Sequence, residues 1–307
     1  MKKIVIILPY FGKFPNYFHL FLNSCYHNSD FDFLIVTDDK LSTKGNVKVL
    51  RMQWSELVNY IQSKFDFKIS IQSPYKLCDF KPAYGYIFEK YLEGYDYWGH
   101  CDADIIWGNL SLLSSVLNKC YDRIGNYGHL MLYKNDFEVN RWFMTLKSVR
   151  VPNYRDVFSN DRNFSFDEFA GMNILLAENK KTVFDERHFD DIIFYASNLF
   201  SRRDCQGVKI KHNTPQYFHY DYGKLYRTVW IDNKWLVDES LYIHLQKRNM
   251  TININDKDNY YIIPNQFVSP NIFSQELDGL SKDRFDLRYH LFMLKTTLKE
   301  KFRILSQ

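Results

Sequence analysis

Apolar runs that end in polar residues constrain the fold of this chain more than any other feature. Lys3–Leu8 is a continuous β-branched run, and Asp32–Thr37 (DFLIVT) is a second apolar run. Such runs are typical of strands that are covered on both faces, as in a parallel sheet. Apolar residues recur at helical spacing in Asn16–Cys25, Trp54–Phe65 and Ala83–Leu92. The alternation predicts an α/β fold with a mainly parallel, Rossmann-like open sheet and flanking helices.

Three of the expected strands end in residues that could form a ligand site. Pro9–Gly12 follows the first strand, Thr37–Asp39 ends the second, and Asp102–Asp104 follows a strand at Tyr95–Cys101. In open α/β sheets, ligands bind beyond the carboxyl ends of the strands. We therefore expect these three segments to share one rim of the sheet.

The second half of the chain has a less regular pattern. It predicts a strand at Gly128–Tyr133, a helix at Phe166–Glu178, a hairpin around Asp232-Asn233 within Thr228–Val237, and short strands at Val208–Lys211 and Tyr242–Leu245. No internal repeat or obvious linker divides it. We expect one catalytic domain over residues 1–280, with a nucleotide-binding half (1–110) and an acceptor-side half (111–280), followed by an amphipathic helix at 281–307.

Composition narrows the class of protein. The formal net charge of +4 is too small to require a nucleic-acid partner. The five cysteines include no CxxC pair, so neither a disulfide framework nor a zinc ribbon is indicated, and a cytoplasmic location is expected. The 26 Phe and 23 Tyr favour carbohydrate or nucleotide ligands, although a codon bias explains them equally well.

Asp102-Ala103-Asp104 is the strongest candidate for chemistry. Two carboxylates separated by one small residue at a strand end can approach one cation, and Mg²⁺ and Mn²⁺ prefer oxygen ligands. An isolated pair of this kind is often only a solvated turn. Here the apolar segment Ile105–Trp107 follows directly, and buried carboxylates need a partner, so a metal site is favoured.

The same segment resembles the metal-binding motif of GT-A glycosyltransferases. IVIILPYFG…FDFLIVTDD and YKLCDFKPAYGYIFEKYLEGYDYWGHCDADIIWGNL look like a bacterial capsule and O-antigen branch of that fold, and the resemblance covers roughly residues 3–250. It implies a metal-dependent transfer of a hexose from a UDP-sugar to a saccharide acceptor, with galactose, as pyranose or furanose, the candidate sugar. It also implies a lipid-linked acceptor and slightly favours inversion at the anomeric carbon.

The resemblance assigns roles to several residues. Pro9-Tyr10-Phe11 is similar to the loop that lines the base and ribose, and Thr37-Asp38 matches the strand end that reaches the same groups. Asp79 and Lys81 correspond to polar contacts with the donor. Asp104 is implied as the direct metal ligand, and Asp102, across Ala103, reaches metal or ribose. A polar turn at Asp38 and a solvated helix start at Lys81 are equally good interpretations.

His244 and the pair Asp167-Glu168 complete the expected site. In many GT-A enzymes a late histidine is a third metal ligand, and imidazole suits Mn²⁺ better than Mg²⁺; His219 is the competing histidine. Asp167 is the better candidate for the general base, with Glu168 beside it. The alternative is a capping box between Ser165 and Glu168 at the start of a helix.

Two further expectations concern the tail and rival functions. Residues 284–305 form a basic amphipathic pattern that could lie on the inner face of the cytoplasmic membrane, or pack on the parent domain.

A sugar-phosphate nucleotidyltransferase would be expected to have a Gly-rich first loop, and PYFGKFP has one Gly. A non-catalytic carbohydrate-binding protein would explain the aromatic residues, but not the acids in apolar context.

Overall fold

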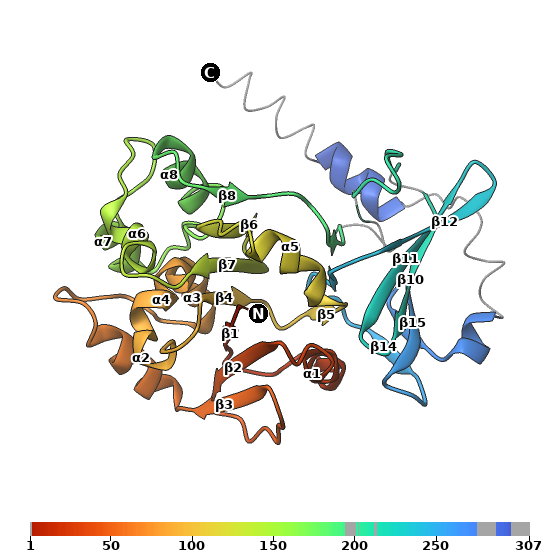
Figure 1. Cartoon of the computed structure of the whole chain (residues 1–307), viewed down its shortest axis with the longest axis horizontal. Coiled ribbons are helices and arrows are strands. Elements are labelled where there is room, and N and C mark those ends of the chain that lie inside the picture. The colour runs from red at the N-terminus through yellow and green to blue at the C-terminus, as the bar shows by residue number, and fades with distance from the viewer. Residues whose placement is uncertain (1, 194–200, 202, 212–213, 275–286, 296–307) are drawn as a thin grey trace. The chain divides into compact units, whose positions relative to one another are not determined.

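The computed structural model (Figure 1) describes residues 2–193, 201, 203–211, 214–274 and 287–295. The chain divides into two compact units that interleave along the sequence. The first unit contains Met1–Phe14, Asn28–Ala103 and Leu110–Arg187, and the second contains Pro15–His27, Asp104–Asn109 and His188–Gln307. The sequence suggested one catalytic domain over residues 1–280 with two halves that meet at residue 110, and this division stays a prediction.

A seven-stranded sheet forms the centre of the first unit (Figure 1). β7 is antiparallel to both of its neighbours, and every other neighbouring pair is parallel. The α/β class with a mainly parallel sheet is therefore confirmed. In sheet order, the strands are β3 (Val47–Arg51), β2 (Phe31–Thr37), β1 (Ile4–Pro9), β4 (Tyr97–Cys101), β7 (Leu130–Lys134), β6 (Arg123–Tyr127) and β8 (Val183–Phe184).

The strands β1, β2 and β4 have their carboxyl ends at the same edge of this sheet. β1 pairs in parallel with β2, where Pro9 lies opposite Val36, and with β4, where Ile7 lies opposite His100. The predicted common rim of β1, β2 and β4 is thus confirmed. Gly99 in β4 must be a glycine, because a Cβ atom there would lie 2.5 Å from the carbonyl oxygen of Met131 on β7.

The helices of the first unit are short. α2 (Trp54–Gln62) begins at the predicted residue, and a capping box between Gln53 and Glu56 stabilises its N-terminus. The long helix expected at 83–92 is wrong, because the chain there forms only η2 (Lys81–Ala83), α4 (Tyr84–Ile87) and η3 (Glu89–Tyr91). Pro82 and Gly85 are poor helix formers, and a Cβ atom at Gly85 would lie 2.5 Å from the Trp98 ring. The other short helices are η1 (Pro74–Lys76), α3 (Leu77–Phe80), η4 (Leu110–Leu113), α5 (Ser114–Leu117), η5 (Val139–Arg141), α6 (Trp142–Thr145) and α7 (Tyr154–Phe158).

The expected helix at 166–178 begins later than predicted. α8 spans Met172–Glu178, with Gly171 at its N-cap. Ser165 has a φ of 51° and does not cap a helix, so the capping-box interpretation is wrong. A Cβ atom at Gly171 would lie 2.1 Å from the carbonyl oxygen of Phe166, which shows how tightly the chain turns before α8. Asp167 and Glu168 therefore lie in a turn rather than in a helix.

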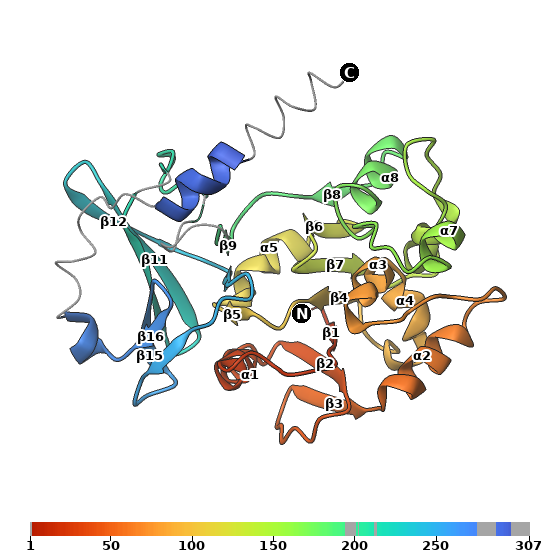
Figure 2. The same ribbon diagram turned by 180° about the vertical axis from the view of Figure 1, so that it is seen from behind.

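The second unit is rich in β-structure and is seen from both sides in Figures 1 and 2. A six-stranded sheet has the order β12 (Lys234–Glu239), β11 (Lys224–Ile231), β10 (Gln216–Asp221), β15 (Asn259–Ile263), β16 (Gln266–Val268) and β14 (Thr251–Asn253). The hairpin around Asp232 and Asn233 is confirmed, and both residues have positive φ angles. The strand expected at 208–211 is wrong, because Gln206 and Gly207 turn the chain and Val208 forms only an isolated bridge to Cys205.

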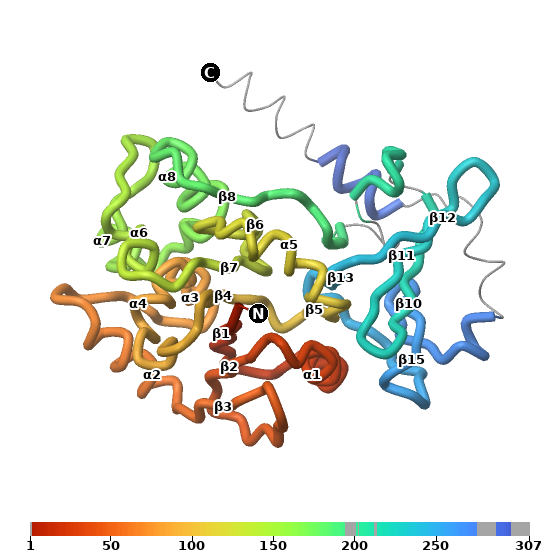
Figure 3. The backbone as a smooth tube through the Cα atoms, viewed as in Figure 1, coloured from red at the N-terminus to blue at the C-terminus, as the bar shows by residue number. Residues whose placement is uncertain are grey.

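A second, three-stranded sheet of this unit carries residues of the expected site. β13 (Tyr242–His244) lies between β5 (Ile105–Trp107), to which it is antiparallel, and β9 (Asp190–Asp191), to which it is parallel. β13 and β5 lie side by side in Figure 3. The helix α1 (Phe18–Tyr26) contributes Leu20 to the apolar core that includes Ile106 and Ile243.

The C-terminal tail is described only in part. Residues 287–295 are helical, and Leu287, Leu291 and Leu294 are 48–60% exposed. The remainder of the predicted helix at 281–307 lies outside the described residues. Within the part of the chain that the structure describes, no helix combines the length and apolar character needed to cross a membrane.

Candidate functional site

The segment Asp102-Ala103-Asp104 contributes one acid to each unit. Asp102 follows β4 in the first unit, and 34% of its side chain is exposed. Asp104 precedes β5 in the second unit and is buried. The two carboxylates therefore meet different surroundings, although only Ala103 separates them in the chain.

Asp104 is paired with His244 inside the second unit. The antiparallel register places His244 opposite Ile105, and the N–H of Leu245 donates to the carbonyl oxygen of Asp104 over 2.8 Å. The same register brings the His244 Nε2 atom to 3.2 Å from Asp104 Oδ1. The backbone N–H of Lys247 donates to Asp104 Oδ2 over 2.6 Å. The short strands β5 and β13 thus bring together two ligand types that the sequence separates by 140 residues.

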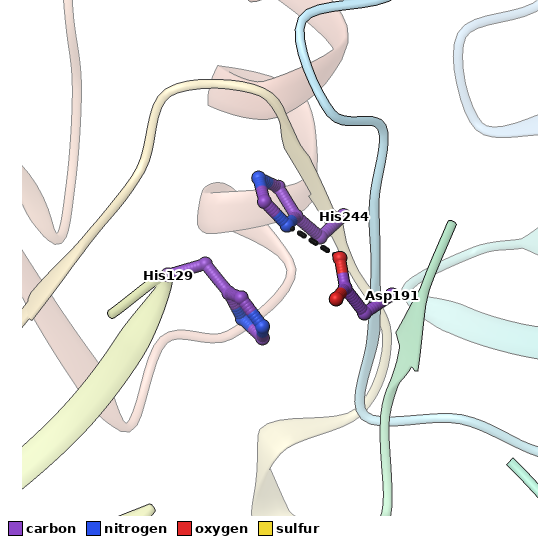
Figure 4. Close-up of side chains that lie close together, drawn as sticks. All are labelled: His129, Asp191 and His244. Carbon is purple, nitrogen blue, oxygen red and sulfur yellow. Dashed lines mark hydrogen bonds and ion pairs between the residues drawn. The ribbon is translucent and has the colours of Figure 1, made fainter. Parts of the chain in front are cut away.

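Asp191 holds the other side of the His244 ring, as Figure 4 shows. β9 places Asp191 beside His244 in the sheet, and the His244 Nδ1 atom lies 2.9 Å from Asp191 Oδ1. The His244 ring thus lies between two carboxylates, with Nδ1 facing Asp191 and Nε2 facing Asp104. Metal-binding histidines in proteins are usually oriented by such a carboxylate.

The Asp104–His244 pair fits a divalent cation. Burial acts to raise the pKa of Asp104, but His244 and the N–H of Lys247 lower it to about 2, so the carboxylate is ionised at neutral pH. Two ligands about 2.1 Å from one octahedral cation, at right angles, lie about 3 Å apart. The observed 3.2 Å between Nε2 and Oδ1 is close to that separation. A nitrogen and an oxygen ligand together suit Mn²⁺.

Lys81 organises the acids of the first unit. Its Nζ atom donates to Asp102 Oδ1 over 2.8 Å and to the carbonyl oxygen of Gly128 over 2.7 Å. Asp167 Oδ2 lies 3.6 Å from the same nitrogen. Burial lowers the pKa of Lys81, but Asp102 and, less strongly, Cys78 and Asp167 raise it well above its ordinary value. Lys81 is therefore a buried ammonium between two carboxylates, and the solvated helix start is wrong.

Asp167 and Glu168 both approach the turn between β6 and β7. Burial raises the pKa of Asp167 to about 7, against the opposing effect of Lys81 and with a further rise from Glu168 and Asp102. The backbone N–H of Gly128 donates to Glu168 Oε1. A Cβ atom at Gly128 would lie 2.6 Å from Glu168 Oε1 and 2.7 Å from Asp167 Oδ2, so both carboxylates depend on that glycine.

Asp79 anchors the turn that carries these acids. Its carboxylate is fully buried, lies 2.7 Å from Lys76 Nζ and accepts the backbone N–H groups of Phe164 and Phe166. Lys76 in turn donates to the carbonyl oxygens of Val157 and Arg162. These contacts give Asp79 a structural function, and its contact with a donor stays a prediction.

The expected nucleotide loop occupies the rim formed by β1 and β2. The N–H of Tyr10 donates to the carbonyl oxygen of Val36 over 2.8 Å, and the Tyr10 ring stacks on Phe14 at 4.4 Å. Tyr10 and Asp38 are partly exposed. Pro9 ends β1 and is also partly exposed. Phe11 and Thr37, in contrast, are buried, and Phe11 packs against Trp54 at 5.2 Å.

The competing histidine, His219, belongs to the six-stranded sheet. Its Nε2 atom lies 3.1 Å from Asn259 Oδ1, and its ring stacks on Tyr261 at 4.2 Å. These contacts explain His219 as part of a sheet surface. His244 is the histidine that the fold brings to Asp104.

Sequence comparison places the chain in a family. Residues 6–271 match a family described as one of unknown function, DUF6625. The chain belongs to DUF6625. No protein with a curated function matches the sequence of this DUF6625 member.

Two solved structures are similar to this DUF6625 chain. One is the galactosyltransferase LgtC in complex with donor and acceptor sugar analogues, at 8% identity and a TM-score of 0.34, over 61% of this chain and 75% of that one. The other is the apo form of the glycosyltransferase GlyE of Streptococcus pneumoniae TIGR4, at 10% identity and a TM-score of 0.32, over 60% of this chain and 45% of that one. The match thus spans less than half of GlyE.

Two residues of the DUF6625 site were missed from the sequence. Asp191 follows Asp190, and a pair of acids in an irregular region gives no signal of a contact with His244. Gly128 begins an expected strand and gives no sign that its N–H and carbonyl oxygen bind Glu168 and Lys81. These contacts become visible only in the structure, through the pairing of β9 with β13 and the approach of the turn before α8.

Proposed function

We propose that this chain is a metal-dependent glycosyltransferase of the GT-A fold, which transfers a hexose from a UDP-sugar to a saccharide acceptor. The observation that carries the proposal is the His244 ring, which lies between Asp104 at 3.2 Å and Asp191 at 2.9 Å. A carboxylate and an oriented imidazole, both buried, have a clear use as cation ligands. The resemblance of the segment around Asp102 to the GT-A metal motif supports the same function.

In this proposal the nucleotide site lies at the rim where β1 and β2 end. Asp104, His244 and Asp102 hold Mn²⁺ or Mg²⁺, and the small Ala103 lets the backbone approach the diphosphate. The cation supplies positive charge that neutralises the diphosphate as it leaves. Tyr10, with Pro9 and Phe11, lines the base, and the Thr37-Asp38 strand end reaches the ribose. Asp79 holds the chain next to Lys81.

Asp167 serves as the general base in an inverting transfer. It takes the proton of an acceptor hydroxyl while that oxygen forms a bond to the anomeric carbon. The bond between the anomeric carbon and the diphosphate breaks, and the electron pair leaves with UDP. A pKa of about 7 suits this task, because a base near the working pH is both deprotonated and basic enough. Glu168, held by the Gly128 N–H, binds hydroxyl groups beside it.

The finer parts of the proposal concern pathway and location. We assign the chain to surface polysaccharide synthesis (capsule or O-antigen), with a lipid-linked acceptor and contact with the cytoplasmic face of the membrane through residues 284–305. The exposed Leu287, Leu291 and Leu294, with the basic Arg288 and Lys295 beside them, support a membrane contact.

A screen of donor hydrolysis tests the enzyme. The protein is incubated with UDP-galactose, UDP-glucose and their N-acetylated forms, with Mn²⁺ or with EDTA, and UDP release is measured. We expect Mn²⁺-dependent release from at least one donor, lost in Asp104→Asn. Release of diphosphate from a nucleoside triphosphate and a sugar phosphate would instead support a nucleotidyltransferase. Sugar binding that is unchanged by EDTA, without turnover of any donor, would support a carbohydrate-binding protein.

A further inference from the structure

An exposed aromatic ring lies on the turn that carries the proposed base. Phe169 comes two positions after Asp167 and directly after Glu168, and it is 57% exposed. The same turn buries Phe166, which is 1% exposed and part of the core. Single exposed phenylalanines are common on protein surfaces. This one is distinguished by its place directly after the buried Asp167 and the partly buried Glu168.

The Phe169 ring is supported by a second aromatic side chain of the same unit. It packs edge-to-face on Tyr127, with 5.5 Å between ring centroids and 81° between ring planes. Tyr127 is itself stacked on His129 at 5.6 Å, and the Arg187 guanidinium lies 5.1 Å from the Tyr127 ring centroid. Tyr127 is therefore held from several sides, and Phe169 rests on a fixed ring.

The backbone under this pair is fixed as well. Tyr127 precedes Gly128, whose N–H binds Glu168 and whose carbonyl oxygen binds Lys81. Phe166, three residues before Phe169, donates its N–H to the buried Asp79 over 3.0 Å. The aromatic pair and the two carboxylates thus belong to one anchored structure, and the exposure of Phe169 does not come from a loosely held loop.

We propose that Phe169 and Tyr127 form a stacking platform for the apolar face of a pyranose ring of the acceptor. This inference rests on the proposed function and names a binding element for its second substrate. A pyranose ring offers C–H groups on one face and hydroxyl groups around its edge. An aromatic face packs against the C–H groups, and carboxylates such as Glu168 accept hydrogen bonds from the hydroxyl groups. The order Asp167-Glu168-Phe169 supplies both within one turn.

Saturation-transfer NMR on the full chain tests the platform without any need for turnover. The probes are methyl β-D-galactopyranoside and methyl β-D-glucopyranoside. We expect saturation of ring C–H protons in the wild type, its loss in Phe169→Ala, and its retention in Phe169→Trp, which keeps an aromatic face. Phe137→Ala is the matched control, because Phe137 is a 73% exposed phenylalanine of the same unit that packs on Arg141 instead.

Kinetics give a second measurement once a donor is known. Phe169→Ala should raise the acceptor KM by about three- to tenfold, as expected from the loss of an aromatic stacking contact. The donor KM should stay the same. Equal saturation in the wild type and in Phe169→Ala, or no saturation in the wild type, would overturn the platform. Failure of the glycosyltransferase proposal is separate, because it would appear as absence of Mn²⁺-dependent UDP binding while sugar saturation at Phe169 persists.

Discussion

Replacing Asp167 with Asn separates catalysis from stability. The substitution removes one ionisable group and nearly preserves its shape. If Asp167 accepts the acceptor proton, turnover should fall by about 10²–10⁴-fold, the usual contribution of a general base. In the wild type, turnover should rise as the pH passes about 7, where the Asp167 carboxyl loses its proton, and the variant should lack this rise.

The same substitution should stabilise the protein at high pH. Burial raises the pKa of Asp167 from its ordinary 3.8 to about 7, so the folded state resists ionisation that the unfolded state undergoes freely. The folded protein therefore loses stability between pH 4 and pH 7, by at most about 4 kcal/mol at roughly 1.4 kcal/mol per pKa unit. Asn carries no charge and avoids this loss. Asp167→Asn should thus gain stability over the wild type as the pH rises, most clearly above pH 7.

Two measurements check this reasoning together. Urea unfolding of wild type and variant at pH 5 and pH 8.5 gives the difference in free energy of unfolding, and UDP release gives turnover at the same pH values. We expect the stability difference to grow in favour of the variant by roughly 2–3 kcal/mol between the two pH values. A variant that is less stable at pH 8.5 would show that the carboxylate is a structural partner of Lys81. Near-normal turnover would show that another group is the base.

Three other predictions address the metal and the tail. Asp104→Asn should abolish Mn²⁺-dependent binding of UDP in calorimetry, and UDP binding that EDTA leaves unchanged in the wild type would refute the metal site. Asp191→Asn should weaken Mn²⁺ binding by about 10- to 100-fold, because His244 loses its orienting carboxylate, and an unchanged affinity would show that Asp191 has no such function. Truncation after Gly279 should release the protein from anionic vesicles in co-sedimentation. The melting temperature should stay unchanged, because Leu287, Leu291 and Leu294 are exposed. A lower melting temperature with unchanged lipid binding would favour a packed helix.

The first sheet could be predicted because the sequence pattern of each strand is local. β1 and β2 are continuous apolar runs, and every residue from Ile4 to Leu8 is buried. Buried parallel strands need such runs, and polar residues at their ends mark the rim. The short helices were harder, since α8 begins six residues after the predicted start at Phe166, where Gly171 lies against the Phe166 backbone. Capping patterns are local, and here a tertiary contact overrides the pattern at Ser165.

The candidate site was predictable where its residues belong to a motif, and not where only pairing creates it. Only Ala103 separates Asp102 from Asp104 in the sequence, and the resemblance to a known family added Lys81, Asp167 and His244. Asp191 lacks any such signal, because its contact with His244 depends on a two-residue strand, β9, in an irregular region. Gly128 likewise acts through its backbone atoms, which no side-chain pattern reveals.

Lys81 links the two halves of the proposed chemistry through charge. Its ammonium lies 2.8 Å from Asp102 and 3.6 Å from Asp167, so one positive charge serves two carboxylates. When Asp167 takes the acceptor proton it becomes neutral, and the attraction of Lys81 is then directed at Asp102 and at the diphosphate that Asp102 is proposed to help bind. Proton uptake at the base therefore strengthens the positive field at the leaving group in the same step. This coupling gives a reason for a buried lysine at this position, where a neutral residue would leave Asp102 and Asp167 to repel each other.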